Sequence, residues 1–311
     1  MCLFLLGLAL LVIGYFFYGR LVERIVGMDD SRPTPAVTHA DGVDFVELPH
    51  WKNMLIQLLN IAGVGPVIGV ILGIKFGSIV FLIIPIGNIL GGAVHDFVSG
   101  VMSLRNRGAN LPALIKMTLG GKFYRFFAVF MVFLLLLVVA VFVNIPAKLI
   151  DGLVPSLAIF HWAVAAIFFY YIAATIFPVD QIIGRIYPFF GLILLIGTFA
   201  IFGMLVWQGF EHPALLSESA EFKAQMETQP IIPALFVTIA CGILSGFHAT
   251  QSPIIARTMP RESHARPAFY GMMVLEGAVG MVWAAGGLAI YNLFPELMQK
   301  DAAVALSRSE E

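Results

Sequence analysis

Charged residues are scarce in this chain. Only 12% of its 311 residues are Asp, Glu, Lys or Arg, whereas about a quarter are charged in soluble globular domains. Cysteine is scarcer still: Cys2 and Cys241 both lie in apolar segments, which argues against a disulfide framework. A formal net charge of −1 gives no electrostatic basis for nucleic-acid binding. With 59% hydrophobic residues and a mean hydropathy of +0.92, the composition instead indicates a membrane protein.

The hydrophobic residues fall into long runs. A helix of about 20 apolar residues crosses the hydrocarbon core of a bilayer, and the sequence contains eight such runs. They predict transmembrane helices near residues 2–19, 51–75, 77–104, 122–143, 157–177, 186–208, 230–259 and 267–294. The first run has no basic residue before it, so we expect a retained helix rather than a cleaved signal peptide. The expected fold is an all-α polytopic membrane protein.

Basic residues are distributed unevenly between the loops. Assigning alternate loops to one side of the membrane places 13 of the 18 Lys and Arg residues together. Because loops rich in Lys and Arg stay in the cytoplasm, the chain is expected to start outside. The helix near 51–75 then begins at the cytoplasmic side.

Two of the expected helices are interrupted near their middles. Glycine and proline weaken a helix, and backbone groups freed inside a membrane must be satisfied by protein, water or a ligand. We therefore predict substrate contacts at both interruptions, although a proline kink in a packed helix is the simpler alternative for the first. The predicted substrate-binding residues are Gly63, Gly65 and Pro66 in the first interruption and Gly246, His248, Thr250, Gln251 and Ser252 in the second.

An offset of 185 residues relates two parts of the chain. Gly-Ala-Val occurs at 92–94 and at 277–279, and the same offset carries Gly63 onto His248 without a gap. Two features at one offset indicate an internal repeat. The two interrupted helices run in opposite directions, so the repeat is inverted, as in LeuT-like (APC-like) transporters.

The repeat divides the chain into four parts. They are an extra N-terminal helix (1–26), a cytoplasmic loop (27–50), a first five-helix repeat (51–229) and the start of a second, inverted repeat (230–311). The last part holds only two of the five expected helices. We therefore expect a truncated piece of a longer protein, or else helices supplied by another subunit.

Three ionisable residues fall near mid-membrane depth: His95, Asp96 and Glu276. A charge there costs a few kcal/mol, so such residues face a protein or water interior. They are candidates for coupling to a proton or another ion, and a structural role as clamps between helices is the alternative. Asn60 and Asn88, in the same apolar context, are expected to make hydrogen bonds between packed helices.

Several segments resemble a known family. "DGVDFVE", "GGAVHDFVSGVMSLRNRG", "FVTIACGILSGFHATQSPIIAR" and "RPAFYGMMVLEG" closely resemble the carbon starvation protein A (CstA) family of bacterial inner-membrane transporters, over residues 41 to about 293. The resemblance implies uptake of peptides or pyruvate during carbon starvation, and a fold of the amino-acid and cation symporter superfamily. Family members continue with further transmembrane helices.

The expected function is secondary active transport across the bacterial inner membrane. A small carboxylate nutrient, a peptide or pyruvate, would bind between the two interruptions, with a proton or sodium ion as coupling partner and no cofactor or metal. Two alternatives remain open. One is a non-transporting sensor subunit. The other is an intramembrane metalloenzyme using His95, Asp96, His248 and Glu276, although no HExxH motif is present.

Overall fold

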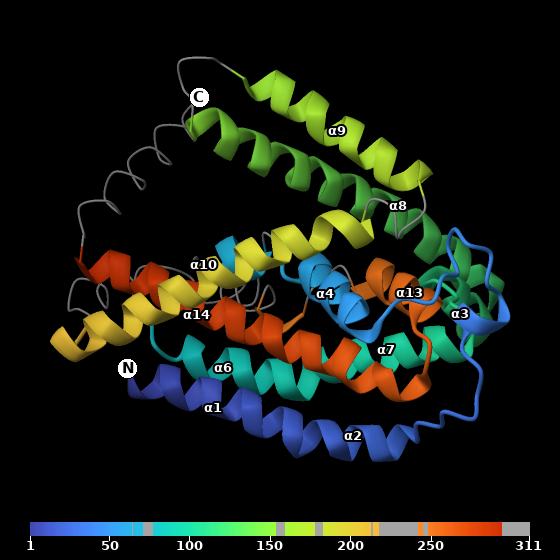
Figure 1. Cartoon of the computed structure of the whole chain (residues 1–311), viewed down its shortest axis with the longest axis horizontal. Helices are drawn as coiled ribbons and strands as arrows, with labels where there is room; N and C mark the ends of the chain where they lie inside the picture. The colour runs from blue at the N-terminus through green and yellow to red at the C-terminus, as the bar shows by residue number, and fades with distance from the viewer. Residues whose placement is uncertain are drawn as a thin grey trace.

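The computed structural model describes residues 1–63, 65–70, 77–153, 159–177, 183–212, 214–217, 242–244 and 248–293. Every regular element in these ranges is a helix (Figure 1). The elements before residue 110 are α1 (Cys2–Phe16), α2 (Tyr18–Val26), α3 (Pro35–Thr38), α4 (His50–Ile61), η1 (Gly65–Gly69), α6 (Val80–Gly87), η3 (Asn88–Gly92) and α7 (Ala93–Arg105). The later ones are α8 (Leu111–Leu153), α9 (Phe160–Ile176), α10 (Ile183–Glu211), α13 (His248–Thr258), η5 (Glu262–His264), η6 (Arg266–Gly271) and α14 (Met272–Leu293).

Five helical segments among the described residues are long and apolar enough to cross a membrane. They are Cys2–Val26, Val80–Arg105, Leu111–Leu153, Pro188–Glu211 and Glu262–Ile290, and they match five of the eight predicted spans. The prediction near 157–177 corresponds to α9, a shorter apolar helix of 17 residues. The helices predicted near 51–75 and 230–259 fall partly outside the described residues. The chain is a multi-pass membrane protein with an all-helical fold.

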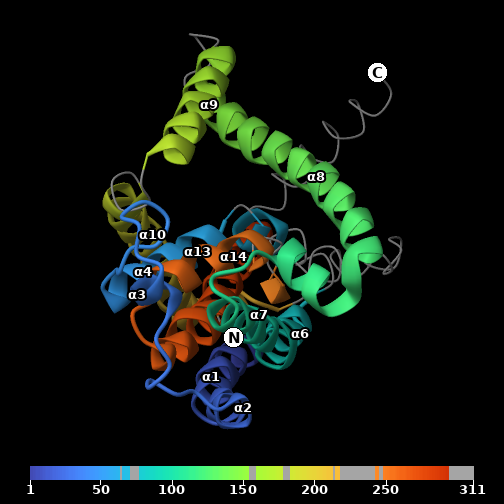
Figure 2. The ribbon, with the colours of Figure 1, turned by 90° about the vertical axis from the view of Figure 1, so that its right-hand side faces the viewer.

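A bundle of helices surrounds the buried core. The helix α1 packs along α6, where Phe4 meets Phe81 edge to face with 5.6 Å between ring centroids. The helix α14 contacts α1, α4, α6 and α10, so it lies at the centre of the bundle. The α8–α9 hairpin leans away from the rest (Figures 1 and 2). Its side chains, among them Phe126, Phe133 and Phe169, are largely exposed, as suits contact with lipid.

The first predicted interruption is present. The helix α4 ends at Ile61, and the Gly63 amide turns back to the Ile61 carbonyl. The π-helix η1 then carries Gly65 and Pro66. Single π turns occur mostly within longer helices and often at functional sites.

The second interruption differs from the prediction. Residues 245–247, and so Gly246, lie outside the described residues, and α13 begins at His248. Thr250, Gln251 and Ser252 therefore lie in a regular helix, where unwound backbone was expected. The Ser252 hydroxyl donates to Asp96 of α7, which satisfies this polar group without opening the backbone.

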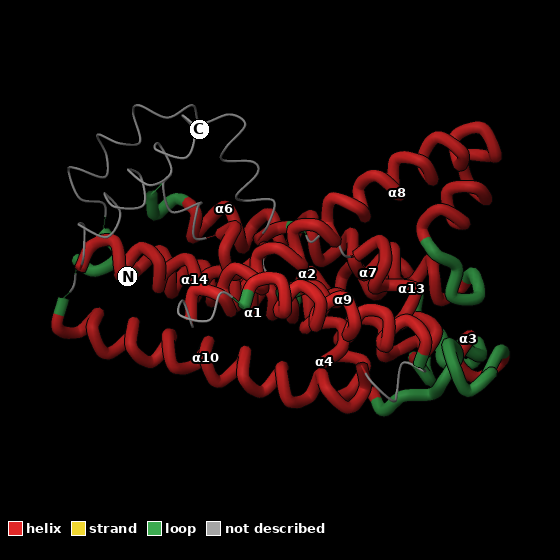
Figure 3. The backbone as a smooth tube through the Cα atoms, turned by 90° about the horizontal axis from the view of Figure 1, so that it is seen from above, coloured by secondary structure: helices red, strands yellow, loops and turns green. Residues whose placement is uncertain are grey.

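Basic side chains gather at one end of the bundle, where α7 and α13 end and α14 begins. The loops at this end, with α3, are seen at the right of Figure 3. Arg105 pairs there with Glu262, and Arg266 with Glu23. We call this the basic end. Such an accumulation of Lys and Arg is the pattern of a cytoplasmic face.

Candidate functional site

Asp96 lies in the centre of the bundle and joins three helices. Its side chain is 0% exposed. The Gln57 amide of α4 donates a 2.7 Å hydrogen bond to Asp96 Oδ2, and the Ser252 hydroxyl of α13 donates a 3.1 Å bond to Oδ1. Because hydrogen bonds to a carboxylate are stronger than neutral ones, Asp96 holds α4, α7 and α13 in register.

Glu276 of α14 faces the same interior. Its side chain is also 0% exposed, and its carboxyl group interacts electrostatically with that of Asp96. Within the part of the chain that the structure describes, neither oxygen of Glu276 has a hydrogen-bond partner. We call Gln57, Asp96, Ser252 and Glu276 the carboxyl cluster.

His95 lies apart from this cluster. Successive side chains on a helix point about 100° apart, and whereas Asp96 is buried, the His95 side chain is exposed. The structure thus brings together two of the three predicted coupling residues. His95 stays close enough to interact electrostatically with Asp96.

The residues of the first interruption lie beside two other helices. A methyl group added at Gly63 would lie 3.1 Å from the ring of Phe142 in α8. One added at Gly280 of α14 would lie 3.3 Å from the carbonyl oxygen of Pro66. Gly280 is one turn after Glu276, so the first interruption packs on the face of α14 that carries this glutamate.

Of the predicted residues in the second interruption, Gln251 and Ser252 are buried and Thr250 is half-buried. Ser252 belongs to the carboxyl cluster. Gly246 and the side chain of His248 lie outside the described residues. The two predicted sets therefore flank one interior, with Pro66 packed against α14 and Ser252 bonded to α7.

Two polar residues of α4 were not among the predicted site residues. Gln57 binds Asp96. Asn53 exchanges hydrogen bonds with Thr258 of α13: its amide donates to the Thr258 carbonyl at 3.0 Å, and the Thr258 hydroxyl donates to Asn53 Oδ1 at 2.7 Å. Asn53, Gln57 and Asn60 follow the spacing i, i+4, i+7 of one helix face, a signal that could have identified this polar stripe.

Glu262 is the buried carboxylate that binds Arg105 at the basic end. It is 2% exposed, and Arg105 binds it through Nε at 2.6 Å. The Asp29 amide donates to Glu262 Oε2 at 2.6 Å, and Arg105 also donates to the carbonyls of Val26 and Gly27. One buried carboxylate thus ties the loop after α2 to α7 and η5.

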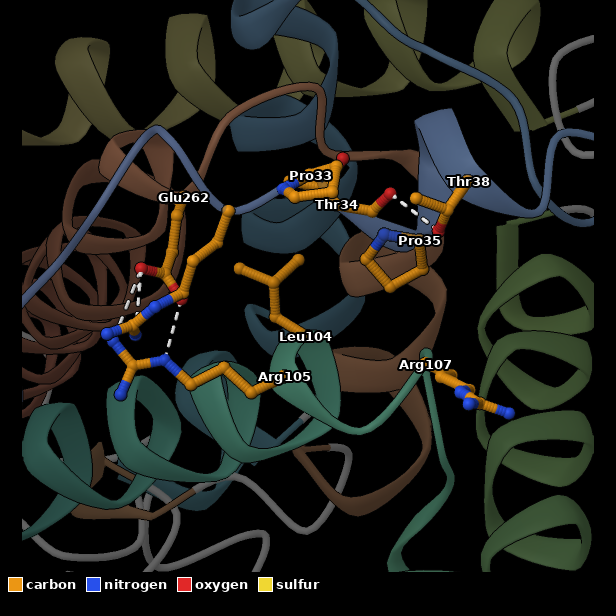
Figure 4. A pocket seen from close by; sticks show the side chains of 9 residues that line it. Pro33, Thr34, Pro35, Thr38, Leu104, Arg105, Arg107 and Glu262 are labelled. Carbon is orange, nitrogen blue, oxygen red and sulfur yellow. Dashed lines mark hydrogen bonds and ion pairs between the residues drawn. The ribbon is translucent and has the colours of Figure 1, made fainter.

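A cavity of about 350 Å³ lies beside this ion pair. In Figure 4 the Arg105 guanidinium points toward Glu262, while Arg107 lies at the other side. The cavity is lined by Arg32, Pro33, Thr34, Pro35, Thr38, Leu104, Arg105, Arg107 and Glu262. Arg32 and Arg105 both pair with Glu262, so two of its three arginines are already bound to a carboxylate.

Two histidines stack at the same end. The rings of His50, at the start of α4, and His264, in η5, have centroids 4.2 Å apart. Both Nδ1 atoms are buried without a hydrogen-bond partner among the described residues. In those residues no group of three or more His, Cys, Asp or Glu side chains is placed to hold a metal ion.

Comparison with known proteins gives the family. The model of the family described as "Carbon starvation protein CstA" matches residues 1–177 and 154–304. An uncharacterized membrane protein of Haemophilus influenzae is 39% identical over 93% of this chain and 91% of its own length. No solved structure matches the chain.

Relatives with named functions are more distant. The peptide transporter CstA of Helicobacter pylori strain J99 is 27% identical over 87% of this chain and 48% of its own length. The pyruvate/proton symporter BtsT of Escherichia coli is 26% identical over 87% of this chain and 46% of its own length. The chain thus spans about half the length of these two relatives. With the family model covering most of its residues, the chain belongs to the CstA family.

Proposed function

We propose that the chain forms the core of a proton-coupled secondary transporter in the bacterial inner membrane. Its substrate is a small carboxylate nutrient, a peptide or pyruvate, bound between the interruptions at 63–66 and 246–253. The names of the relatives support this choice of substrates, and the name of the symporter relative supports the proton as coupling ion.

The carboxyl cluster is the observation that carries the proposal. Burying two carboxyl groups from different helices, Asp96 and Glu276, inside a membrane protein costs folding free energy. A bundle stabilised by apolar contacts alone does not need them. Two such groups beside an interrupted helix are typical of an ion-coupled transport pathway.

The substrate carboxylate would lie near the start of α13. The first amides of a helix lack intrahelical partners and favour an anion. The helix α13 begins at His248, next to the second interruption. Its N-terminal amides can therefore donate to a carboxylate, a group that pyruvate and the C-terminus of a peptide share.

We also propose that the fold contains the inverted repeat. The two helical segments that carry Gly-Ala-Val meet in the core, where Asn88 donates a hydrogen bond to the carbonyl of Met273, 185 positions later. A contact between residues separated by the repeat offset is expected near a twofold axis that relates the two units.

Uptake by the purified chain in proteoliposomes tests the function. Labelled pyruvate and a labelled dipeptide are added outside, with and without an inward proton gradient. We expect accumulation of at least one of them under the gradient, and its loss with a proton ionophore. A properly inserted chain that neither accumulates nor exchanges any substrate of a wider carboxylate panel would rule out transport and favour a sensor subunit.

A further inference from the structure

The two buried carboxyl groups of the carboxyl cluster differ in how they are bonded. Asp96 accepts a side-chain hydrogen bond on each oxygen, from Gln57 on one side and Ser252 on the other. Any step that moved Asp96 from this position would break the side-chain bonds that link α7 to α4 and to α13. Asp96 is therefore built into the packing of the bundle.

Glu276 has no such bonds to break. Both of its oxygens are buried, and neither has a partner among the described residues. An ionised carboxylate in this position is strongly disfavoured, because no donor replaces the water it has lost. The neutral acid is disfavoured much less. The surroundings of Glu276 thus distinguish sharply between its two protonation states.

The polar atoms around Glu276 also favour its neutral, protonated form. Four buried oxygens of the described interior lack a donor: Oε1 and Oε2 of Glu276, Oε1 of Gln57 and Oδ1 of Asn88. The unpartnered buried donor there is Nε2 of Gln251. Buried polar groups are normally paired, so this interior has an excess of acceptors. A proton on Glu276 turns one of these acceptors into a donor.

Glu276 is also placed to respond to the substrate region. Gly280, one turn later on the same face of α14, packs on the Pro66 carbonyl of the first interruption. A shift of the first interruption against α14 therefore changes the surroundings of Glu276 directly. The π-helix η6 ends at Gly271, five residues before Glu276, and π turns often accompany functional sites within helices.

We propose that Glu276 is the group that takes up and releases the coupled proton, and that Asp96 is a positioning residue that holds α4, α7 and α13 together. The assignment rests on the proposed transport function. In one half-cycle the Glu276 carboxylate binds a proton from the outer water. In the other half-cycle the carboxylic acid returns that proton to the cytoplasm.

Transport by Glu276→Gln separates coupling from movement of the substrate. Glutamine imitates the neutral acid but cannot exchange a proton. We expect E276Q to retain substrate counterflow in proteoliposomes and to lose both accumulation under a proton gradient and the substrate-dependent pH change. E276D keeps a carboxyl group and should keep coupling with a shifted pH profile. Asp96→Asn should slow counterflow while leaving the remaining transport proton-coupled. Accumulation by E276Q equal to that of the wild type would overturn the assignment.

Infrared spectroscopy tests the same assignment without transport. A buried protonated carboxyl group gives a carboxylic-acid C=O stretch, and we expect E276Q to lose a component of this band that Asp96→Asn retains. The matched control is Glu262→Gln, which replaces a carboxylate paired with Arg105 and should leave the band in place. A band in E276Q as intense as that of the wild type contradicts the role of Glu276. Absence of uptake by the wild type, with that component still lost in E276Q, contradicts the transport function alone.

Discussion

The side-chain amide of Asn88 donates a 3.0 Å hydrogen bond to the backbone carbonyl of Met273, 185 positions later in the chain. The contacts around this bond are reciprocal. Gly277 lies against Asn88, and Gly92 lies against the Met273 side chain. The offset of 185 carries Asn88 onto Met273 and Gly92 onto Gly277, so it converts each contact into the other. Reciprocal contacts of this kind are the property of a twofold interface.

The two glycines of this contact should be equally intolerant of a side chain. A methyl group added at Gly277 would lie 2.7 Å from Asn88 Nδ2, and one added at Gly92 would collide with the carbonyl of Ile243. We expect Gly92→Ala and Gly277→Ala each to lower stability by about 1–3 kcal/mol, measured by thermal unfolding in detergent. Gly91 has nothing within 4 Å of such a methyl group. Gly91→Ala should leave stability unchanged or raise it slightly, and three equal melting temperatures would contradict the packing described.

The hydrogen bond between Ser252 and Asp96 should contribute measurably to stability. Ser252→Ala removes the 3.1 Å bond to Asp96 Oδ1 and leaves a fully buried acceptor with one partner fewer. The expected loss is about 1–3 kcal/mol in chemical or thermal unfolding. Thr175→Ala is the control, because the exposed Thr175 hydroxyl donates to the Tyr171 carbonyl of its own helix. A loss from Thr175→Ala as large as that from Ser252→Ala would argue against a specific role for the carboxylate bond.

The sequence predicted the apolar spans well. The helix expected over 77–104 runs over Val80–Arg105, and the one expected over 267–294 matches η6 and α14. Hydrophobic run length decides these elements, because a bilayer requires a nearly fixed number of apolar residues. The first interruption could be predicted equally well, since Gly63 and Pro66 weaken the helix through local backbone chemistry. Asn88 makes a hydrogen bond between packed helices as predicted, whereas the Asn60 amide donates to the Ile56 carbonyl of its own helix.

The second interruption and the different roles of the site residues could not be predicted from the sequence in the same way. Polar residues 250–252 suggested unwound backbone, but the structure has them helical, because Ser252 is satisfied by Asp96 of another helix. Such a bond depends on tertiary packing and leaves no local signal. The same applies to His95, Asp96 and Glu276. Their depth could be predicted from the spans, whereas the partners that separate a bonded Asp96 from an unbonded Glu276 could not.

The ion pair between Glu262 and Arg105 should hold the loop after α2 against the bundle. Glu262→Gln removes the charge that binds Arg105 and, at 3.6 Å, Arg32. We expect faster proteolysis within residues 27–48 and a loss of stability below the roughly 3–5 kcal/mol of a fully buried pair, because the Arg105 side chain is 30% exposed. Glu47→Gln changes an exposed carboxylate of the same loop and should leave both measurements as in the wild type. Unchanged proteolysis in Glu262→Gln would show that the loop is held by its other contacts.

The stacked histidines at the basic end should make stability depend on pH. Burial, followed by the neighbouring His264 imidazole, lowers the pKa of His50 from 6.5. Asp30 and Arg261 are the other charged groups that act on this pair. Because the folded pKa lies below that of the unfolded chain, the unfolded state binds more protons. The stabilising contribution is therefore complete above about pH 6.5 and is lost as the pH falls through the folded pKa of His50.

Melting temperatures measured between pH 5 and 8, roughly the range in which histidine titrates, test this dependence. His50→Phe keeps an aromatic ring against His264 but cannot be protonated, so its melting temperature should fall less toward low pH than that of the wild type. Trp51→Phe is the matched control, because Trp51 is the next residue of α4, is exposed and carries no titratable group. It should follow the wild-type pH curve. If His50→Phe also follows that curve, protonation at the stacked pair does not limit stability, and other groups must account for the acid sensitivity.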